Sequence, residues 1–138
     1  MFALLSFYIS LIATANENSF NYTVKSNNNR REFMRFTSFL QDGHLTVVLT
    51  GEIDHHCAKS YINSIAAKIE AYTPRVCVLD FQEVTFMDSS GIAVVINALR
   101  NMSRIQGELV LVGLNAQPMK VFRASGIDKL VQIKETVS

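Results

Sequence analysis

The sequence predicts an α/β fold: a single domain with a small, mixed and mostly parallel sheet, an antiparallel edge, and flanking helices. Three observations support this class. The chain has 138 residues, which suits one domain and is long enough to bury a core without disulfides. Hydrophobic residues make up 49% and charged residues 18%, a balance typical of globular proteins. Strand-like and helix-like patterns also alternate along the chain, as they do in parallel sheets.

The N-terminal segment differs from the rest of the chain. Its first fourteen residues, "MFALLSFYISLIAT", are apolar and uncharged, but they are too short to span a bilayer comfortably and lack the basic start of a signal peptide. Residues 16–31 are polar and rich in Asn without periodicity, which predicts a disordered linker. We therefore assign residues 1–33 to an extension outside the fold and residues 34–138 to the domain. Two alternatives stay open for the extension: a weak membrane anchor, or an upstream start that is not used.

A hairpin and a long helix are predicted next. Residues 36–40 and 44–51 have strand composition on either side of the turn "QDG". Over residues 55–71 the apolar residues recur at helical spacing, and Asp54 is placed to cap this helix. Pro74 ends this predicted unit of hairpin and helix. The shared helix face holds Ala58, Ile62, Ile65 and Ile69, with Tyr61 and Ala66 beside it.

Two buried strands then frame a second helix. Residues 75–81, "RVCVLDF", and residues 108–114, "ELVLVGL", are apolar on both alternations, as strands covered on both faces are. Between them a helix is predicted from Ser89 or Ser90 to about Met102. Its expected core stripe consists of Ile92, Val95, Ile96 and Leu99.

A short helix and a last short strand, "KLVQI", close the chain. The helix is expected to begin at Asn115, with Pro118 in its first turn and Gly126 as its C-cap. The order is therefore two strands, helix, strand, helix, strand, helix and a final strand. This alternation predicts a largely parallel sheet with an antiparallel edge.

Composition excludes some classes of function. The formal net charge is +1, from thirteen basic and twelve acidic residues, so no broad field attracts nucleic acid or an anionic membrane. The chain has no Trp, and its aromatic residues do not form a base-stacking series. Cys57 and Cys77 are the only cysteines, without a second pair for zinc, and two reduced thiols are favoured over a disulfide.

The segment "IDHHC" contains the residue types that bind metals. Consecutive helical residues, however, point about a quarter-turn apart, so these side chains cannot all close on one ion. There is also no His-x-x-x-His pair on this helix. A capped, solvated helix start is therefore favoured over a metal site, although the same residues could form part of a contact surface.

The segment "FMDSSGI" interrupts an apolar run with Asp88, Ser89, Ser90 and Gly91. Asp and Ser are leading N-cap residues, so one interpretation is a helix cap alone. A serine nucleophile is a second interpretation, with His44, His55 or His56 as base. It is disfavoured because Met87 replaces the first glycine of the esterase elbow, and because an acid before Ser89 opposes an oxyanion. No glycine-rich nucleotide loop is present.

The position of this segment nevertheless favours a functional site. Open α/β sheets place their sites at the carboxyl ends of parallel strands. A serine at a helix start can carry a phosphate, because free N–H groups and the helix dipole stabilise the added charge. Glu52, Asp54 and His55 also follow a strand, so parallel topology should bring them to the same edge.

Three motifs now indicate a family. "LTGEIDHH", "VLDFQEVTFMDSSGI" and "QGELVLVGL" occur in an order and spacing that resemble the anti-sigma factor antagonists of spore-forming bacteria, single-domain members of the STAS family. The resemblance covers about residues 34–138. "GEIDHH" together with "FMDSSGI" is specific for that branch, whereas "DSSG" alone is weaker. The resemblance implies the STAS fold, with Ile53 where Leu is common.

The resemblance implies a cytoplasmic partner switch in sporulation, without enzymatic activity, cofactor, direct nucleic-acid contact or membrane contact. Its unphosphorylated form would bind an anti-sigma factor with serine kinase activity and so release a sigma factor. The kinase would phosphorylate Ser89, the first serine of the motif, and a protein phosphatase would reset it. The residues expected to bind the partner are Glu52, Asp54, His55, Asp88, Ser90 and Gly91.

Two alternatives remain. One is a STAS module that regulates a transporter, serves a lipid-transport component or binds a small ligand. The other is a small hydrolase that uses Ser89. The extension of residues 1–33, which the typical antagonist lacks, is the one clear departure from the family pattern, and we expect it to be dispensable for folding and switching.

Overall fold

The computed structural model describes residues 20–25 and 33–135. The strands are β1 (Phe20–Lys25), β2 (Phe33–Gln41), β3 (His44–Ile53), β4 (Val76–Met87), β5 (Glu108–Val112) and β6 (Gln132–Lys134). The helices are α2 (His55–Tyr72), α3 (Ser90–Arg104) and α4 (Ala116–Ser125), followed by a 3-10 turn, η2 (Ile127–Lys129). From β2 onward this order confirms the predicted succession of strands and helices, whereas β1 is an additional strand and the last strand begins at Gln132 rather than at Lys129.

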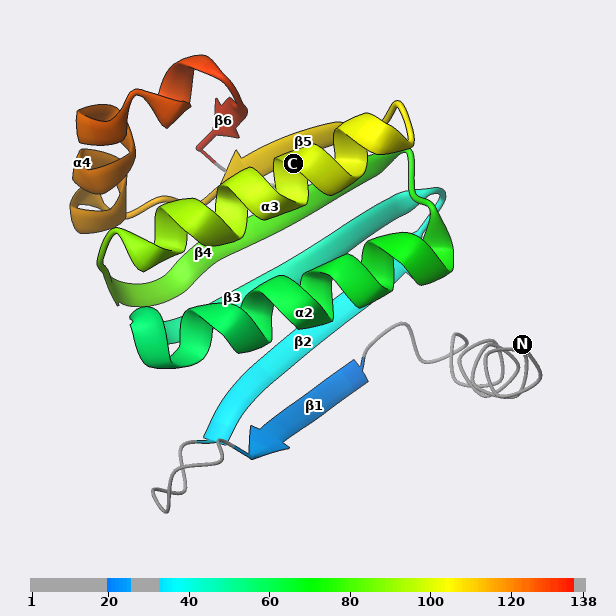
Figure 1. Ribbon diagram of the computed structural model, residues 1–138, viewed down its shortest axis with the longest axis horizontal. Coiled ribbons are helices and arrows are strands. Elements are labelled where there is room, and N and C mark those ends of the chain that lie inside the picture. The colour runs from blue at the N-terminus through cyan, green and yellow to red at the C-terminus, as the bar shows by residue number, and fades with distance from the viewer. Residues whose placement is uncertain (1–19, 26–32, 136–138) are drawn as a thin grey trace.

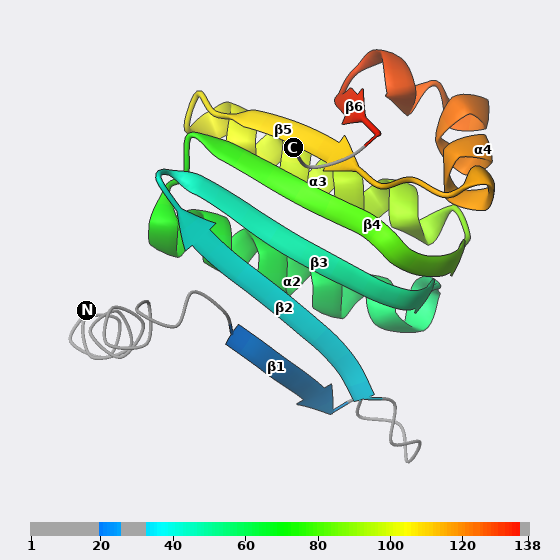
Figure 2. The same cartoon turned by 180° about the vertical axis from the view of Figure 1, so that it is seen from behind.

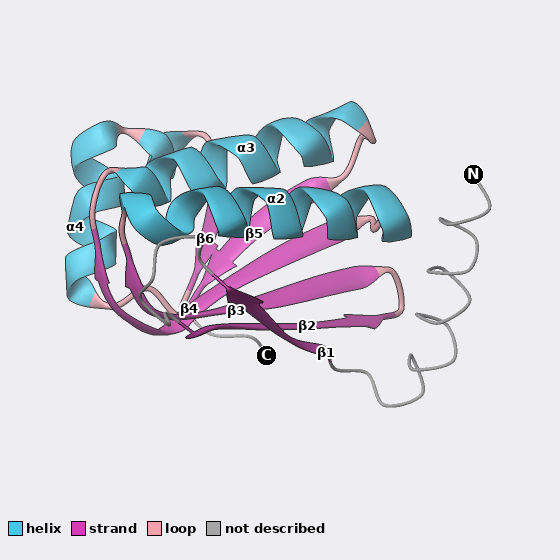
Figure 3. Ribbon diagram, turned by 60° about the horizontal axis from the view of Figure 1, so that its bottom comes forward, coloured by secondary structure: helices cyan, strands magenta, loops and turns pink. Residues whose placement is uncertain are grey.

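The described strands form one sheet in which β1 to β6 lie side by side in sequence order. The pairs β1–β2 and β2–β3 are antiparallel, and the pairs from β3 to β6 are parallel. Helices α2 and α3 lie across one face of the sheet, and α4 stands at the end where β3 and β4 finish (Figures 1 and 3). No described helix covers the opposite face (Figure 2). The predicted fold class, a small mixed sheet with flanking helices, is confirmed.

The turn of the β2–β3 hairpin is the predicted "QDG". Gln41 and His44 are paired across it, and both Asp42 and Gly43 have positive φ. The turn also holds the start of β4, because Arg75 donates its backbone N–H to the Gly43 carbonyl at 2.9 Å and its side chain to the Asp42 carbonyl at 3.0 Å. The hairpin thus fixes where the first parallel strand begins.

β4 is longer than the sequence indicates. The predicted strand ended at residue 81, whereas β4 continues along β3 to Met87. β5 pairs with β4 only as far as Asp80 and Val112, so the last part of β4 extends past β5. This part escaped prediction because its register shifts, and each shift breaks the alternation that marks a strand.

The register shifts lie toward the C-terminal end of β3, between Val48 and Thr50 and between Gly51 and Glu52. Tyr61 of α2 compensates the first shift. Its hydroxyl donates to the Thr50 carbonyl at 3.2 Å and accepts from the Thr50 N–H at 3.3 Å. A side chain from the helix thereby supplies hydrogen bonds at the place where the strand ladder is irregular.

β1 lies inside the stretch that the sequence predicted to be a disordered linker. Its six residues pair antiparallel with residues 33–38 of β2. β2 itself begins at Phe33, three residues before the predicted strand. Pairing with an existing sheet edge uses backbone groups, so it needs no apolar period and leaves none in the sequence. The division of the chain at residue 34 stays a prediction.

The helix caps follow the prediction more closely than the buried faces do. Asp54 is the N-cap of α2, Asn115 that of α4, and Gly126 ends α4 in the left-handed conformation. In α3, however, Ile96 is 40% exposed, so its place in the predicted core stripe is wrong. The buried residues of α3 are Gly91, Val94, Val95, Ala98 and Met102, and Ile92 and Leu99 of the predicted stripe are partly buried against the core.

Lys68 is a buried lysine in α2. Its side chain is 7% exposed, and its ammonium lies 5.8 Å from the centre of the Tyr72 ring, within the range of a cation–π contact. Because burial disfavours the charged form, the pKa of Lys68 is lowered to about 8. The folded state therefore binds this proton less tightly than the unfolded chain does.

Replacing Lys68 with Met should change how stability depends on pH. In the unfolded chain the lysine pKa is about 10.4, so between that value and the folded pKa of about 8 the unfolded state binds more protons. The contribution of Lys68 to the free energy of unfolding should therefore rise with pH through this window in the wild type. Lys68→Met should be the more stable protein below the window, and its advantage should shrink across it.

Urea melts of both proteins from about pH 7 to about pH 10.5 measure this difference. The buried thiols of Cys57 and Cys77 are present in both proteins, so their titration cancels in the comparison. A stability difference that stays constant across the window would contradict the prediction.

Candidate functional site

The carboxyl ends of β3 and β4 meet at one edge of the sheet, as the sequence predicted. Glu52 and Ile53 of β3 are in register with Phe86 and Met87 of β4. The following residue, Asp88, donates its backbone N–H to the Ile53 carbonyl at 3.1 Å. The "GEIDHH" and "FMDSSGI" motifs are thereby joined directly. Both α2 and α3 begin at this edge (Figure 1).

Asp54 organises the start of α2. Its Oδ1 accepts hydrogen bonds from the backbone N–H groups of His56 at 2.9 Å and Cys57 at 3.2 Å. Partial burial acts to raise the pKa of this carboxyl, but the two N–H donors and the neighbouring His56 outweigh it, so the pKa of Asp54 lies below its ordinary value. A half-buried carboxylate therefore stands at the edge at neutral pH.

Cys57 ties the end of β3 to the same helix start. Its thiol accepts from the Asp54 N–H at 3.4 Å and donates to the Glu52 carbonyl at 3.3 Å. Burial raises the pKa of Cys57 to about 11, so the thiol keeps the proton that it donates. Asp54 and Cys57 together form a capping box, with cysteine at the position that Glu or Gln usually holds. The sequence analysis missed this role, although the spacing from Asp54 could have indicated it.

The three histidines divide between two ends of the sheet. His55 and His56 are exposed at the edge, with ring centres 3.9 Å apart, and His56 Nδ1 lies 3.5 Å from Asp54 Oδ2. His44 begins β3, about 30 Å away along a ten-residue strand. It is therefore excluded as a base for Ser89. Within residues 20–25 and 33–135, no cluster of three or more His, Cys, Asp or Glu side chains could hold a metal ion.

The side chain of Asp88 binds the first turn of α3, and the N-cap residue Ser89 lies at the surface. Asp88 Oδ1 accepts from the Ser90 N–H at 2.7 Å, and the Asp88 carbonyl accepts from the Gly91 N–H at 3.1 Å. Ser89 is exposed, has helical backbone angles and makes no capping hydrogen bond with its side chain. The side chain that binds the helix start is thus Asp88, where the sequence analysis left the choice among Asp and Ser.

The first N–H groups of α3 are already occupied, contrary to expectation. Besides the two bonds to Asp88, the Ile92 N–H donates to the Ser89 carbonyl at 3.1 Å. A phosphate on Ser89 would therefore compete with Asp88 for donors and would lie beside its carboxylate. The Asp88 carboxylate would repel a phosphate at this point, and the backbone N–H groups do not form a ready phosphate-binding site.

Gly91 is fixed by packing rather than by its backbone angles. A Cβ at this position would overlap Sδ and Cγ of Met87, and the Met87 side chain is completely buried. Close approach of α3 to the end of β4 thus depends on the absence of a side chain. Phe86, the neighbour of Met87 in the strand, is 44% exposed and adds apolar surface to the edge.

Two amide side chains at the start of α4 hold the last residues of β4, and the sequence analysis missed both. Gln117 accepts from the Met87 N–H at 2.9 Å and donates to the Met87 carbonyl at 2.8 Å. Asn115 donates to the carbonyls of Gln82 at 3.2 Å and Val84 at 3.0 Å. These contacts span some thirty residues of chain, so no local pattern reveals them.

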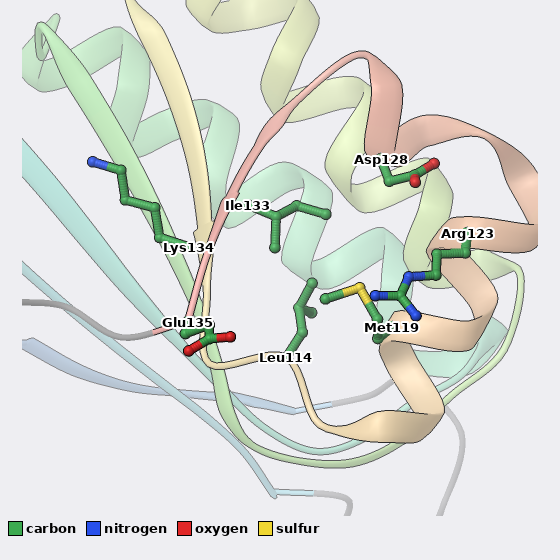
Figure 4. Close-up of a pocket in the computed structure, with 7 residues that line it drawn as sticks. All are labelled: Leu114, Met119, Arg123, Asp128, Ile133, Lys134 and Glu135. Atoms are coloured by element: carbon green, nitrogen blue, oxygen red, sulfur yellow. The ribbon is translucent and has the colours of Figure 1, made fainter.

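Two cavities lie apart from this edge. One of about 650 Å³ is formed where α4, η2 and β6 approach one another (Figure 4), and a second of about 410 Å³ lies beside Gly113. The first is lined by Leu114, Met119, Arg123, Asp128, Ile133, Lys134 and Glu135. Neither cavity contains any of the predicted site residues. Charged side chains of both signs line the first, unlike the mostly apolar pockets typical of small-molecule sites.

Residues 40–138 match the STAS domain family, and the chain therefore belongs to it. Among curated relatives, an anti-sigma-B factor antagonist of Listeria monocytogenes is 31% identical over 94 residues, which cover 66% of this chain and 79% of the relative. An anti-sigma F factor antagonist of Lysinibacillus sphaericus is 30% identical over 83 residues, covering 60% and 71%.

Solved structures confirm the fold. The anti-sigma factor antagonist SpoIIAA in its unphosphorylated form gives a TM-score of 0.67 at 24% identity, covering 75% of this chain and 89% of that one. The phosphorylated form of SpoIIAA from Bacillus gives 0.61 at 24% identity, covering 75% and 92%. Among the described residues, no helix has the length and apolarity needed to cross a bilayer.

Gly91→Ala should destabilise the protein by about 1–3 kcal/mol, the usual cost of overpacking a core. The added methyl would displace Met87, which is completely buried. Urea unfolding measures the loss, and a double-mutant cycle with Met87→Ala tests its cause. In the Met87→Ala background the same glycine substitution should cost clearly less. Equal costs in the two backgrounds would show that Met87 is not the group that excludes a side chain at residue 91.

Proposed function

We propose that this protein is an anti-sigma factor antagonist that works by partner switching. Its unphosphorylated form binds an anti-sigma factor with serine kinase activity and so frees a sigma factor. Phosphorylation of Ser89 ends the binding, and a protein phosphatase restores it. The observation that carries the proposal is the exposed Ser89 at the junction of β4 and α3, on the edge that also holds Glu52 and Asp54.

The comparisons support the partner class. The curated relatives are anti-sigma factor antagonists, and they align over most of their own length. The combination of "GEIDHH" and "FMDSSGI" supports the finer assignment to the sporulation branch, and with it a cytoplasmic location beside the transcription machinery. In this proposal the protein acts by binding, without cofactor or catalysis of its own.

The proposed docking edge comprises Glu52, Asp54, His55, Asp88, Ser89, Ser90 and Gly91. Glu52, His55 and Ser89 are exposed and available for direct contact, whereas Ser90 is half-buried and Gly91 is buried. Gly91 therefore shapes the edge rather than touching a partner. The exposed Phe86 lies in register with Glu52 and offers an apolar contact beside the acidic groups.

Charge explains how one phosphate could reverse binding. The docking edge already carries the carboxylates of Glu52, Asp54 and Asp88, and a phosphate adds a charge of about −1.5 to −2. A partner surface fitted to a neutral serine then meets extra bulk, repulsion and a desolvation cost. A loss of about 3 kcal/mol would weaken binding about a hundredfold, which is enough to exchange partners.

The geometry argues against a serine hydrolase. Of the three candidate bases, His44 lies at the far end of β3. The Asp88 carboxylate binds the Ser90 N–H directly beside Ser89, where an acyl-transfer enzyme needs donors for an oxyanion. The N–H groups of residues 90–92 already have acceptors. The same features leave the Ser89 hydroxyl exposed to a kinase.

Ser89→Ala should abolish phosphorylation by the anti-sigma factor kinase of the same organism. Incubation with the kinase and ATP, followed by mass spectrometry of the peptide that contains both serines, measures the modification. Ser90→Ala is the matched control and should still be phosphorylated, because Ser90 is half-buried and follows the exposed residue. Full phosphorylation of Ser89→Ala at Ser90 would overturn the assignment.

Ser89→Asp should bind the anti-sigma factor about a hundredfold more weakly than the wild type, while Ser89→Ala should bind regardless of the kinase. Ser89→Asn separates charge from size, since it matches Asp in shape without its charge. Calorimetric titration gives the affinities. If Asn weakens binding as much as Asp does, bulk rather than charge operates the switch.

The NMR amide spectra of the phosphorylated and unphosphorylated protein should differ only around Ser89. Chemical-shift changes spread over β3, β4 and β5 would indicate a conformational switch instead.

A further inference from the structure

On their α4 side, the last residues of β4 have no neighbouring strand within the part of the chain that the structure describes. β5 pairs with β4 only up to Asp80 and Val112, while β4 runs on to Met87. A strand edge left in this way has backbone groups that need other partners. Asn115 and Gln117 of the α4 segment supply them with side-chain amides.

Of these two residues, Gln117 makes its contact nearer to Ser89 and to the turn from Asp88 to Gly91. It bonds to both the N–H and the carbonyl of a single residue, Met87, at 2.9 and 2.8 Å. A neighbouring strand would form the same pair of bonds, so the amide replaces one rung of the missing strand. Met87 directly precedes Asp88, the residue whose side chain binds the Ser90 N–H in the first turn of α3.

Met87 is held on every side. Its backbone is fixed by Gln117, its side chain is completely buried against Gly91, and the next N–H along the chain donates to Ile53. The α4 segment is itself packed on the sheet through Phe122, whose buried ring lies edge-on against Phe81 with centres 5.6 Å apart.

We propose that Gln117 is a positioning residue for the switch: through Met87 it fixes the Asp88–Gly91 turn and so the presentation of Ser89 to the kinase and to the partner. This inference rests on the proposed function for its biological meaning, but its structural part stands alone. Packing against Gly91 fixes the Met87 side chain in the core, whereas Gln117 fixes the position of the Met87 backbone at the edge of the sheet. Loss of the amide therefore frees the turn without unfolding the core.

Hydrogen exchange of single amides tests the structural part without any partner. Gln117→Met keeps the length of the side chain and removes both bonds to Met87. In this variant the Ser90 and Gly91 amides, which donate to Asp88, should exchange about tenfold faster. The Cys57 amide, bound to Asp54 across the edge, should keep its wild-type rate.

Asn115→Leu is the matched control. Asn115 is the N-cap of α4, yet its side chain makes no capping bond and donates only to Gln82 and Val84, upstream of the switch. This variant also loses two hydrogen bonds between the α4 segment and β4, but it should leave the Ser90 and Gly91 amides unchanged. Unchanged exchange in Gln117→Met, or equal acceleration in both variants, would overturn the proposal.

The functional part is measured with the anti-sigma factor kinase. At matched fractions folded, the kcat/KM for phosphorylation of Ser89 should fall about tenfold in Gln117→Met and stay near the wild-type value in Asn115→Leu. Equal rates in all three proteins would overturn the positioning role. If the wild type is not phosphorylated at all, the proposed function fails, while the exchange result still decides whether Gln117 holds the turn.

Discussion

The parallel pairing of β3 with β4 is the constraint on which the site depends. Parallel strands finish at the same edge of a sheet, so two motifs separated by 29 residues of chain become neighbours. The bond from the Asp88 N–H to the Ile53 carbonyl extends this pairing one residue past the end of β4. Without this parallel pairing, the acidic residues near the start of α2 and the serines at the start of α3 would belong to two separate helix starts.

Three side chains convert this juxtaposition into a fixed surface. Cys57 binds backbone groups of Glu52, at the end of β3, and of Asp54, while Asp88 binds the first turn of α3 and Gln117 binds Met87. Each satisfies backbone groups that the sheet and the helices leave unpaired at their ends. Ser89 lies among these groups, is exposed, and makes no capping hydrogen bond with its side chain.

The negative charges around Ser89 determine how this surface would respond to an added phosphate. Asp54 stays ionised because backbone N–H groups bind it, and Asp88 lies beside Ser89, the proposed phosphorylation site. Added negative charge at Ser89 therefore meets existing negative charge, and the occupied N–H groups of α3 offer it little compensation. If Ser89 is phosphorylated as proposed, this surface would therefore bind a partner better with the neutral serine than with the phosphorylated form.

Local sequence determined the hairpin turn, the Asp54 cap, the αL end of α4 at Gly126 and the position of the "DSSG" turn. Each depends on residues within a few positions of one another, so backbone preference and capping chemistry are enough. Tertiary structure alone decided the extra length of β4, the pairing of β1, the exposure of Ile96 and the hydrogen bonds of Gln117 to Met87. These depend on register shifts and on contacts between distant segments, whose energies exist only once the sheet and helices have come together.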